Sequence, residues 1–266
     1  MPSKPPEDRL IGKTFEKCRI LAKLGTGGMG SVWLAEHFGL NRKVAVKILP
    51  SDMGRDPEYV ARFMREATTA GRMEHPNIVQ IHDIGYAEGR HFIVMQYVDG
   101  EALSTVVDHL GAMEPRDAAR VAAGILRGLQ HAHEHGIVHR DVKPDNVLIA
   151  KGDRPMILDF GLAIETEASL HITKDGMVVG TPYYLAPEQA RGQKATPACD
   201  LYSAGVTLYF LLTGKRPFVG ATALAVLNKH IHEAPVPPIK IKTDIPRTLS
   251  DIVLKMMAKN PTERYK

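Results

Sequence analysis

A short stretch near the middle of the chain gathers three chemically active side chains. Residues 139–146 read HRDVKPDN, which places the carboxylate of Asp141, the ammonium of Lys143 and the amide of Asn146 in one segment of six residues. A second acid, Asp159, follows in the string DFG. Carboxylate and amide oxygens are ligands that hard cations such as Mg²⁺ prefer. The stretch therefore predicts a site that combines a carboxylate, a cationic side chain and a bound metal ion.

A glycine-rich string lies between two strand-like runs near the N-terminus. Residues 25–32 read GTGGMGSV, and residues 18–24 and 32–37 flank it. Glycines allow positive φ and let backbone N–H groups approach an anion, so a hairpin folded over phosphates is one interpretation and a structural turn is the other. A dinucleotide-binding fold is excluded, because its glycines open a helix. Here Ser31, Val32 and Trp33 continue as a strand.

These strings occur in an order that resembles the Hanks-type protein kinases. The order is G-x-G-x-x-G-x-V, Lys47, Glu66, HRD-x-K-x-x-N, DFG and Ala186-Pro187-Glu188. The lysine at position 143, two residues after Asp141, resembles the Ser/Thr branch of that family rather than the Tyr branch. The strings FIVMQYVDG and GTPYYLAPEQARG resemble its bacterial members. The resemblance covers roughly residues 15–265. It implies a two-lobed α+β fold that binds ATP between the lobes and transfers the γ-phosphoryl group to Ser or Thr hydroxyls of proteins.

The resemblance also assigns a role to each residue of the site. Asp141 would orient the acceptor hydroxyl and accept its proton, Lys143 would neutralise charge on the γ-phosphate, and Asn146 and Asp159 would hold Mg²⁺, for which Mn²⁺ is an alternative. Lys47 would contact the α- and β-phosphates, and Glu66 would orient that lysine. Val32 and Ala45 would lie above the adenine and Leu148 beneath it, with Met95 as gatekeeper. The implied ATP-binding positions are Gly25, Thr26, Gly27, Gly28, Met29, Gly30, Val32, Ala45, Lys47, Met95, Gln96, Val98 and Leu148.

Two alternatives accompany these assignments. Glu58 is the rival of Glu66, but it lies in the first turn of the predicted helix, where stabilisation of the helix N-terminus explains it. A catalytically silent kinase-fold scaffold is the alternative for the whole chain. Substitution of Lys47, Asp141 or Asp159 would favour the scaffold, and each of them is present.

The elements that must position these residues follow from sequence periodicity and capping signals. Asp56 and Pro57 predict the start of a helix whose apolar stripe runs to Ala70. Helices are also predicted over residues 117–135 and 198–212. The predicted strands are residues 18–24, 32–37, 44–48, 78–84, 91–96, 147–149 and 156–158. The resulting division is a disordered lead-in of residues 1–14, an N-lobe of residues 15–98 and a C-lobe of residues 99–266, with the final helix of the domain expected to be missing.

Histidines gather at the end of the predicted helix 117–135. A zinc site at His131 and His135 is one interpretation, since these residues share a helix face, and a polar helix end is the other. No HExxH string or suitably spaced Cys accompanies them, which favours the polar helix end. His139 is interpreted as a packing residue of the HRD string. The resemblance further implies that Asp200 braces this string and that Arg264 pairs with Glu188.

Composition limits the classes of partner and compartment. The net charge is +4 and the pI is near 9.0, but the basic residues form no run or nucleic-acid-binding string, so no nucleic-acid partner is predicted. Two cysteines without a C-x-x-C spacing favour a reducing compartment. No apolar run is long enough to span a bilayer. A cytoplasmic location is predicted, and relatives of this kind imply that a full-length protein can be anchored to the membrane.

The segment between Asp159 and Glu188 is the predicted regulatory region. It contains Thr166, Ser169, Thr173 and Thr181, and Arg140 could bind a phosphate there because a guanidinium fork matches phosphate oxygens. We expect Thr173 to be the main autophosphorylation site, modified by a second copy of the chain acting in trans. Asp175 would supply a fixed negative charge nearby. A polar loop without a regulatory role is the alternative.

Overall fold

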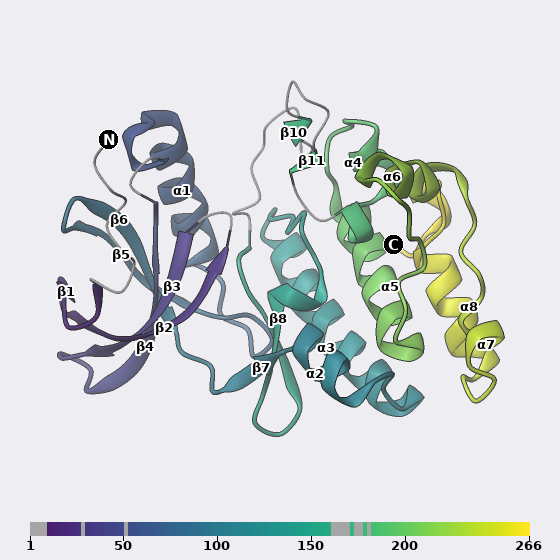
Figure 1. The fold of residues 1–266 in the computed structure, drawn as a ribbon, viewed down its shortest axis with the longest axis horizontal. Coiled ribbons are helices and arrows are strands. Elements are labelled where there is room, and N and C mark those ends of the chain that lie inside the picture. Colours follow the sequence, from purple (N-terminus) through teal and green to yellow (C-terminus); the bar gives the residue numbers. More distant parts are fainter. Residues whose placement is uncertain (1–9, 28–29, 51–52, 161–170, 173–177, 180–181) are drawn as a thin grey trace. The chain divides into compact units, whose positions relative to one another are not determined.

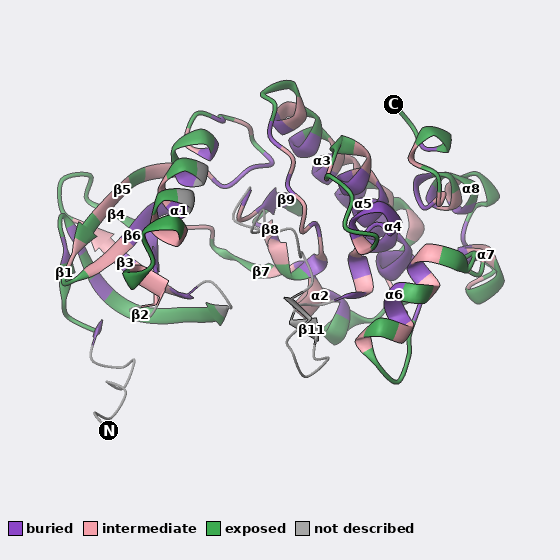
Figure 2. Cartoon of the chain, turned by 90° about the horizontal axis from the view of Figure 1, so that it is seen from above, coloured by how far each residue is buried: buried purple, intermediate pink, exposed green. Residues whose placement is uncertain are grey.

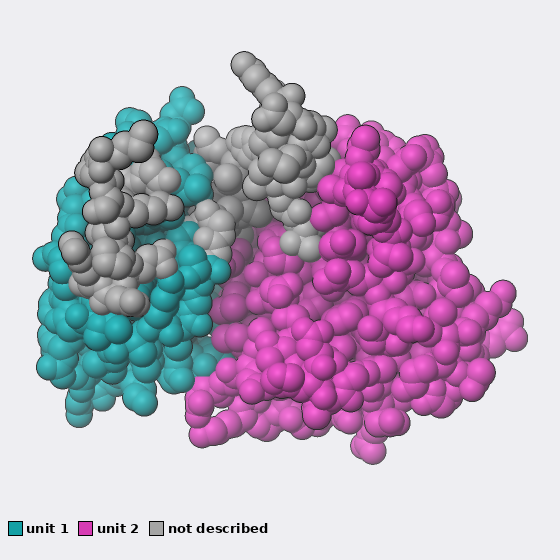
Figure 3. Space-filling model, in the orientation of Figure 1, with its two compact units in different colours: residues 1–74, 79–98 teal, residues 75–78, 99–266 magenta. Residues whose placement is uncertain are grey.

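The computed structural model describes residues 10–27, 30–50, 53–160, 171–172, 178–179 and 182–266 (Figure 1). The chain divides into two compact units. Unit 1 comprises residues 1–74 and 79–98, and unit 2 comprises residues 75–78 and 99–266 (Figure 3). In the residues that the structure describes, unit 1 is built on a six-stranded sheet with one α-helix, whereas unit 2 is mainly helical. This is the α+β composition that the sequence predicts.

The sheet of unit 1 is antiparallel throughout, in the order β1-β2-β3-β4-β6-β5. Its strands are β1 (Thr14–Phe15), β2 (Cys18–Gly27), β3 (Gly30–His37), β4 (Arg42–Ile48), β5 (Ile81–Ala87) and β6 (Arg90–Gln96). The β5–β6 turn falls at Glu88 and Gly89, both at positive φ, which is the conformation that a tight two-residue hairpin turn requires. The β2–β3 hairpin carries the glycine-rich string at its tip.

One face of this sheet forms the hydrophobic core of unit 1. Side chains alternate between the two faces of a strand, so every second residue of β4 points into the core. Val44, Val46 and Ile48 do so, and Trp33 is the largest fully buried side chain beside them. The indole N–H of Trp33 donates to Ser31 Oγ at 2.8 Å, which satisfies its one polar atom. The opposite face is therefore available for other residues of β4.

The helix of unit 1, α1 (Pro57–Ala70), begins where its capping signals predict. Asp56 is the N-cap, and its carboxylate accepts from the N–H groups of Glu58 and Tyr59 at 2.9 and 3.3 Å. Pro57 at the first position has no N–H to leave unsatisfied. The buried side of the helix carries Phe63, Ala67 and Ala70. A short 3₁₀ turn, η2 (Met53–Arg55), precedes it.

Unit 2 consists of helices and two small sheets. Its α-helices are α2 (Leu103–Leu110), α3 (Pro115–Glu134), α4 (Pro187–Ala190), α5 (Pro197–Thr213), α6 (Ala223–His232), α7 (Pro238–Ile241) and α8 (Arg247–Met256). Its strands are β7 (Gly100–Ala102), β8 (Val147–Ala150) and β9 (Arg154–Ile157) in one sheet, and β10 (His171–Ile172) and β11 (Val178–Val179) in the other. Its 3₁₀ turns are η3 (Pro144–Asn146), η4 (Pro182–Tyr184) and η5 (Pro261–Glu263).

Helix α5 is the centre of unit 2. It is buried along nearly its whole length (Figure 2), and a helix that is apolar around its circumference belongs in a core. It packs against α3, α7 and α8. Helix α3, which was predicted over residues 117–135, buries an apolar stripe that runs from Ala118 to Ala132. Among the described residues, no helix combines the length and apolar character needed to cross a bilayer.

One predicted strand is wrong at its start. The pattern indicated a strand over residues 78–84, but β5 begins at Ile81 and residues 75–78 belong to unit 2. Asn77 explains this: its carboxamide donates to Pro155 O at 2.7 Å, and its carbonyl accepts from Ile157 N at 2.8 Å. Gly124 of α3 makes room for the segment, since a Cβ there would lie 2.4 Å from Pro155 Cγ and 3.1 Å from Asn77 Nδ2.

Candidate active site

The loop before β8 gathers its polar side chains on Asp141. The Lys143 ammonium donates to Asp141 Oδ2 at 2.5 Å, and the Asn146 amide donates to the same oxygen at 2.9 Å. Asn146 also donates to the backbone carbonyl of Asp141 at 2.8 Å. Pro144 begins η3, and this turn places Asn146 back beside Asp141. The structure thus brings together three of the residues that the sequence singled out, on a carboxylate that is 40% exposed.

The buried side chain of His139 connects the loop of Asp141 to the end of β9. Its ring is fully buried, its Nδ1 accepts from the Asp141 N–H at 3.2 Å, and its Nε2 lies 2.8 Å from Leu158 O. Since Nδ1 is an acceptor, the ring proton lies on Nε2 and donates to the Leu158 carbonyl. The ring also meets the edge of Phe160 at 4.8 Å between centroids. The predicted packing role of His139 is confirmed.

The β8–β9 hairpin places the two candidate metal ligands at one end of a ladder. Val147, the first residue of β8, pairs with Ile157, the last residue of β9. Asn146 directly precedes β8 and Asp159 follows β9 by two residues, so both lie at this end of the hairpin. The Leu158 N–H donates to Asn146 O at 2.8 Å, which closes this end of the hairpin. Asp159 has φ of 57°, a left-handed conformation that is uncommon for a non-glycine residue. A carboxylate and an amide oxygen form a donor set that fits Mg²⁺.

Asp200 of α5 anchors the backbone on the other side of Asp141. Its Oδ1 accepts from the Arg140 N–H at 2.7 Å and its Oδ2 from the His139 N–H at 2.8 Å, as the resemblance implies. Arg140 has φ of 72°, so the carboxylate holds a left-handed residue directly before Asp141. Such a residue persists only where its surroundings overdetermine it, and such residues cluster at functional sites.

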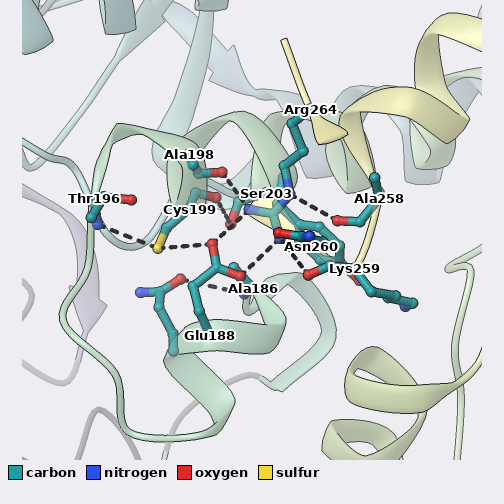
Figure 4. Close-up of polar contacts among 12 residues, drawn as sticks. Ala186, Glu188, Thr196, Ala198, Cys199, Ser203, Ala258, Lys259, Asn260 and Arg264 are labelled. Atoms are coloured by element: carbon teal, nitrogen blue, oxygen red, sulfur yellow. Dashed lines mark hydrogen bonds and ion pairs between the residues drawn. The ribbon is translucent and has the colours of Figure 1, made fainter. Parts of the chain in front are cut away.

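Glu188 and Arg264 form a buried bidentate ion pair (Figure 4). The distances are 2.6 Å from Nη1 to Oε1 and 2.8 Å from Nη2 to Oε2, and the two side chains are 5% and 0% exposed. Burial acts to raise the pKa of Glu188, but the hydrogen bonds and charge of Arg264 outweigh it and leave that pKa below its usual value. Arg264 also donates to the carbonyls of Ala198, Ala258 and Lys259. The predicted pairing is confirmed.

Two residues that the sequence analysis missed belong to this framework. The Cys199 thiol lies 3.3 Å from Glu188 Oε1 and donates to it, and burial raises the pKa of the thiol to about 12 (Figure 4). Gln189 donates through Nε2 to Arg140 O at 3.1 Å and accepts through Oε1 from Ala186 N at 3.3 Å. Gln189 therefore connects the Ala186-Pro187-Glu188 string to the loop of Asp141. A cysteine directly before Asp200 and an amide directly after Glu188 were the only signals, and neither is specific.

In unit 1, the face of the sheet opposite the core collects the predicted nucleotide-binding residues. Ala45 and Lys47 are two positions apart on β4, Val32 pairs with Lys47, and Met95 pairs with Ala45. Directly paired residues in antiparallel strands share a face, so these four side chains lie together. Lys47 is only 4% exposed, which is unusual for a lysine and is typical of functional or paired ones.

The glycine-rich hairpin is confirmed in the described part of its tip. Gly25 pairs with Val32, Thr26 with Ser31, and Gly27 with Gly30. Gly30 has φ of 123°, and a Cβ there would lie 2.2 Å from Ile48 O. This position requires glycine because β4 passes so close to it. Gly28 and Met29 lie outside the described residues.

Several of the remaining predicted positions lie outside the described residues. Glu66 lies in α1, but its side chain is outside the described part of the structure, as are Thr166, Ser169, Thr173, Asp175 and Thr181. The Gln96 N–H donates to Gln80 O at 2.8 Å, so a ligand at Gln96 would have to use the carbonyl. Val98 and Leu148 are half-buried, in unit 1 and in β8 of unit 2 respectively.

At the end of α3, the ring of His131 stacks on that of His75 and lies tilted against that of His135. His131 lies 5.2 Å from His75 and 4.5 Å from His135 between ring centroids. Burial, together with the neighbouring His131 and Arg127, lowers the pKa of His75. Within the described ranges, no group of three or more His, Cys, Asp or Glu side chains could hold a metal ion. These contacts favour the polar helix end over the zinc site.

Comparison with known proteins decides the family. The model of the protein kinase domain matches residues 18–266. The chain belongs to the protein kinase family. It is 44% identical over 247 residues to the serine/threonine-protein kinase PknB of Mycolicibacterium smegmatis, and 40% identical over 257 residues to PrkC of Bacillus subtilis. These alignments cover 91% and 96% of this chain but 40% of each relative. The predicted resemblance to bacterial Ser/Thr kinases is confirmed, and the chain spans less than half the length of these relatives.

Further comparisons agree on the family and the kinase fold. PknA of Mycobacterium tuberculosis is 44% identical over 262 residues, which is 96% of this chain and 60% of that protein. The solved PknI kinase domain of the same organism has a TM-score of 0.71 at 29% identity, and the match covers 96% of this chain and 93% of that one. A double mutant of that domain has a TM-score of 0.75 at 27% identity. The predicted fold class is therefore confirmed.

Proposed function

We propose that this kinase domain transfers the γ-phosphoryl group of ATP to Ser or Thr hydroxyls of protein substrates. The observation that carries the proposal is the state of the Asp141 carboxylate. Lys143 and Asn146 both donate to its Oδ2, while within the described residues its Oδ1 makes no hydrogen bond. The carboxylate is thus fixed through one oxygen and can receive the proton of an acceptor hydroxyl through the other.

Phosphoryl transfer requires positioning and neutralisation of charge more than covalent chemistry by the protein. Asp141 orients the acceptor hydroxyl towards the phosphorus and takes its proton. Lys143, held 2.5 Å from the same carboxylate, supplies positive charge where negative charge accumulates on the transferred group. The hydrogen bonds from Asp200 to His139 and Arg140, and that from His139 to Leu158, keep this loop in one conformation before substrate arrives.

Asn146 and Asp159 are the residues proposed to hold the metal ion. Bound Mg²⁺ would supply positive charge that the ATP phosphates require. The amide nitrogen of Asn146 already donates to Asp141, so its oxygen is the atom that remains for a cation. An all-oxygen donor set also accommodates Mn²⁺.

The nucleotide-binding part of the proposal rests on unit 1. Val32, Ala45 and Met95 give one sheet face an apolar surface suited to a purine ring, and Lys47 places a buried ammonium on the same face. We propose that Lys47 contacts the α- and β-phosphates and that Glu66 orients it. The backbones of Gln96 and Val98 would recognise the adenine edge, Leu148 would contact its other face, and residues 25–30 would contact the phosphates.

We further propose that protein Ser/Thr residues, including Thr173 of a second copy, are the acceptors. Arg140 lies in the same loop as Asp141, and its guanidinium is suited to bind a phosphate on Thr173. Both cysteines are buried free thiols, and we place the domain in the reducing cytoplasm on that basis.

The test is intact mass spectrometry of phosphatase-stripped protein after incubation with ATP and Mg²⁺, together with a generic protein acceptor. Phosphate-sized mass increases in the wild type and none in Asp141→Asn would support the proposal. Loss of the increases in Lys47→Met, with retained folding, would support the nucleotide assignment. No transfer to self or acceptor, with ATP still raising the thermal midpoint, would establish the silent scaffold instead.

A further inference from the structure

The buried carboxylate of Asp200 receives a third hydrogen bond, from a side chain rather than the backbone. His133 Nε2 lies 2.8 Å from Asp200 Oδ2, the oxygen that also accepts from the His139 N–H. The Asp200 side chain is 1% exposed. Among the described residues, the other two donors are backbone N–H groups, so His133 is the only side chain bonded to this carboxylate. Hydrogen bonds to a buried ionised group are the strong ones, and losing one leaves an acceptor unsatisfied.

The geometry of this contact fixes which ring nitrogen is the donor. A carboxylate can only accept, so Nε2 of His133 must carry a proton and donate. His133 also lines a cavity of about 1050 Å³ formed by α3, α5, α8 and the last residues of the chain, and its side chain is 20% exposed. The edge of the ring that faces away from Asp200 therefore has room around it. Substitutions of similar size can be accommodated there without crowding the core.

The hydrogen bond from His133 matters because Asp200 holds the backbone next to Asp141. Arg140 has φ of 72°, and a non-glycine residue keeps this left-handed conformation only where its neighbours compensate for the strain. The bond from the Arg140 N–H to Asp200 Oδ1 is part of that compensation, at 2.7 Å. If the carboxylate rotates, both backbone bonds lengthen together, because its two oxygens are rigidly joined. Asp141 is the next residue in the chain, so such a rotation would displace its carboxylate.

We propose that His133 is a positioning residue for phosphoryl transfer, acting through Asp200 on the backbone of residues 139–141. The inference rests on the proposed function of Asp141 and adds to it a residue on α3 that lies outside the proposed catalytic and metal-binding set. It assigns a role to one of the histidines that the sequence pattern left as a polar helix end. It predicts that the donor on residue 133, not the imidazole as such, matters.

Three variants separate this role from a general effect on folding. His133→Phe keeps a ring but removes the donor, and His133→Gln keeps an N–H donor of similar reach. His135→Phe is the matched control, because this exposed histidine lies on the same helix end and bonds to His131 O instead. We expect kcat of His133→Phe to fall about tenfold or more with KM for ATP within about twofold, as for loss of one bond to a charged group. His133→Gln and His135→Phe should stay within about threefold of wild type.

A second measurement does not depend on activity. Hydrogen exchange of the backbone amides of His139 and Arg140, without nucleotide, should speed up in His133→Phe and remain protected in His133→Gln. Unchanged kcat and unchanged protection in His133→Phe would overturn the inference, as would equal losses in the Phe and Gln variants. A lower thermal midpoint with kcat per folded molecule unchanged would also overturn it. If the wild type is no more active than Asp141→Asn, the proposed function fails, and the exchange comparison still decides the role of His133.

Discussion

The ion pair between Glu188 and Arg264 allows a quantitative test of what holds unit 2 together. All N–H groups of the Arg264 guanidinium have acceptors: Nε donates to Ala258 O, Nη1 to Glu188 and Ala198 O, and Nη2 to Glu188 and Lys259 O. One side chain therefore joins the Glu188 carboxylate, the N-terminal turn of α5 and the chain that follows α8. The perturbations are Glu188→Gln, Arg264→Met and the double variant.

The expected magnitudes follow from burial. With side chains 5% and 0% exposed, removal of either partner leaves an uncompensated buried charge, which costs about 3–5 kcal/mol of unfolding free energy. Removing both charges leaves no such group, so the double variant should lose less than the sum of the two single losses, by about 2 kcal/mol or more. The Cys199 thiol does not substitute for the arginine, because a thiol is a weak donor without charge.

The assay should report on unit 2 rather than on the whole chain. Trp33 is the only tryptophan and lies in the core of unit 1, so its fluorescence follows that unit. Far-UV circular dichroism in urea reports mainly on the helices, most of which belong to unit 2. We expect the dichroism transition to move to lower urea concentration in both single variants, and the unfolding free energy derived from it to fall by the amounts given above. Arg247→Met is the control, since its side chain is 88% exposed and its 3.9 Å contact with Asp251 contributes little.

The reasoning would be refuted by either of two results. Single losses below about 1 kcal/mol would mean that the pair contributes no more than an exposed ion pair. Losses that add within about 0.5 kcal/mol in the double variant would mean that the two charges do not compensate each other.

Two further predictions concern other parts of the molecule. Gly30→Ala should destabilise unit 1 by about 1–3 kcal/mol, read from Trp33 fluorescence in urea, because of its φ of 123° and the nearby Ile48 O. Gly25→Ala should cost about 1 kcal/mol or less, because no atom of the described residues lies within 4 Å of the place of its Cβ. Equal losses would argue against the close approach of Gly30 to β4. Burial, aided by the charge of Lys259, lowers the pKa of His230 to about 3, so below pH 6.5 the unfolded chain takes up a proton that the folded chain does not, and stability falls as pH falls from 6.5 towards 3. The free energy of unfolding, measured by urea denaturation, should therefore fall more between pH 7.5 and pH 5.5 in the wild type than in His230→Phe, by about 1 kcal/mol. Identical decreases in the two proteins would contradict a neutral buried imidazole.

The sequence was sufficient where a local rule decides the structure. Asp56 and Pro57 specify the start of α1, because the Asp56 carboxylate accepts from backbone N–H groups within three residues. The strings around Asp141 and Asp159 were found because their spacing is itself the signal. In each case the residues that cooperate are close together in the chain.

Local rules were insufficient where a side chain bonds to a distant segment. The sequence around Ile78 has the pattern of a strand. Asn77, however, donates to the carbonyl of Pro155, 78 residues away, and this bond holds the segment outside the sheet of unit 1. Gln189 binds the carbonyl of Arg140 over 49 positions, and His133 binds Asp200 over 67. No periodicity records such bonds, because each depends on how two elements pack. The sequence therefore indicated Asp141 and, through the resemblance, the bracing by Asp200, but not Gln189 or His133, whose hydrogen bonds also hold this loop.

The segment of residues 75–78 has a consequence for anyone who divides this chain. It is encoded inside unit 1 yet is bonded to β9 and packed at Gly124 of α3. A fragment ending at Val98 would carry Asn77 without Pro155, and a fragment beginning at Asp99 would leave the Ile157 N–H without its acceptor. The chain passes between the units at three points, not one. A chimera that exchanges one unit with a relative must therefore take residues 75–78 from the parent that supplies the helical unit.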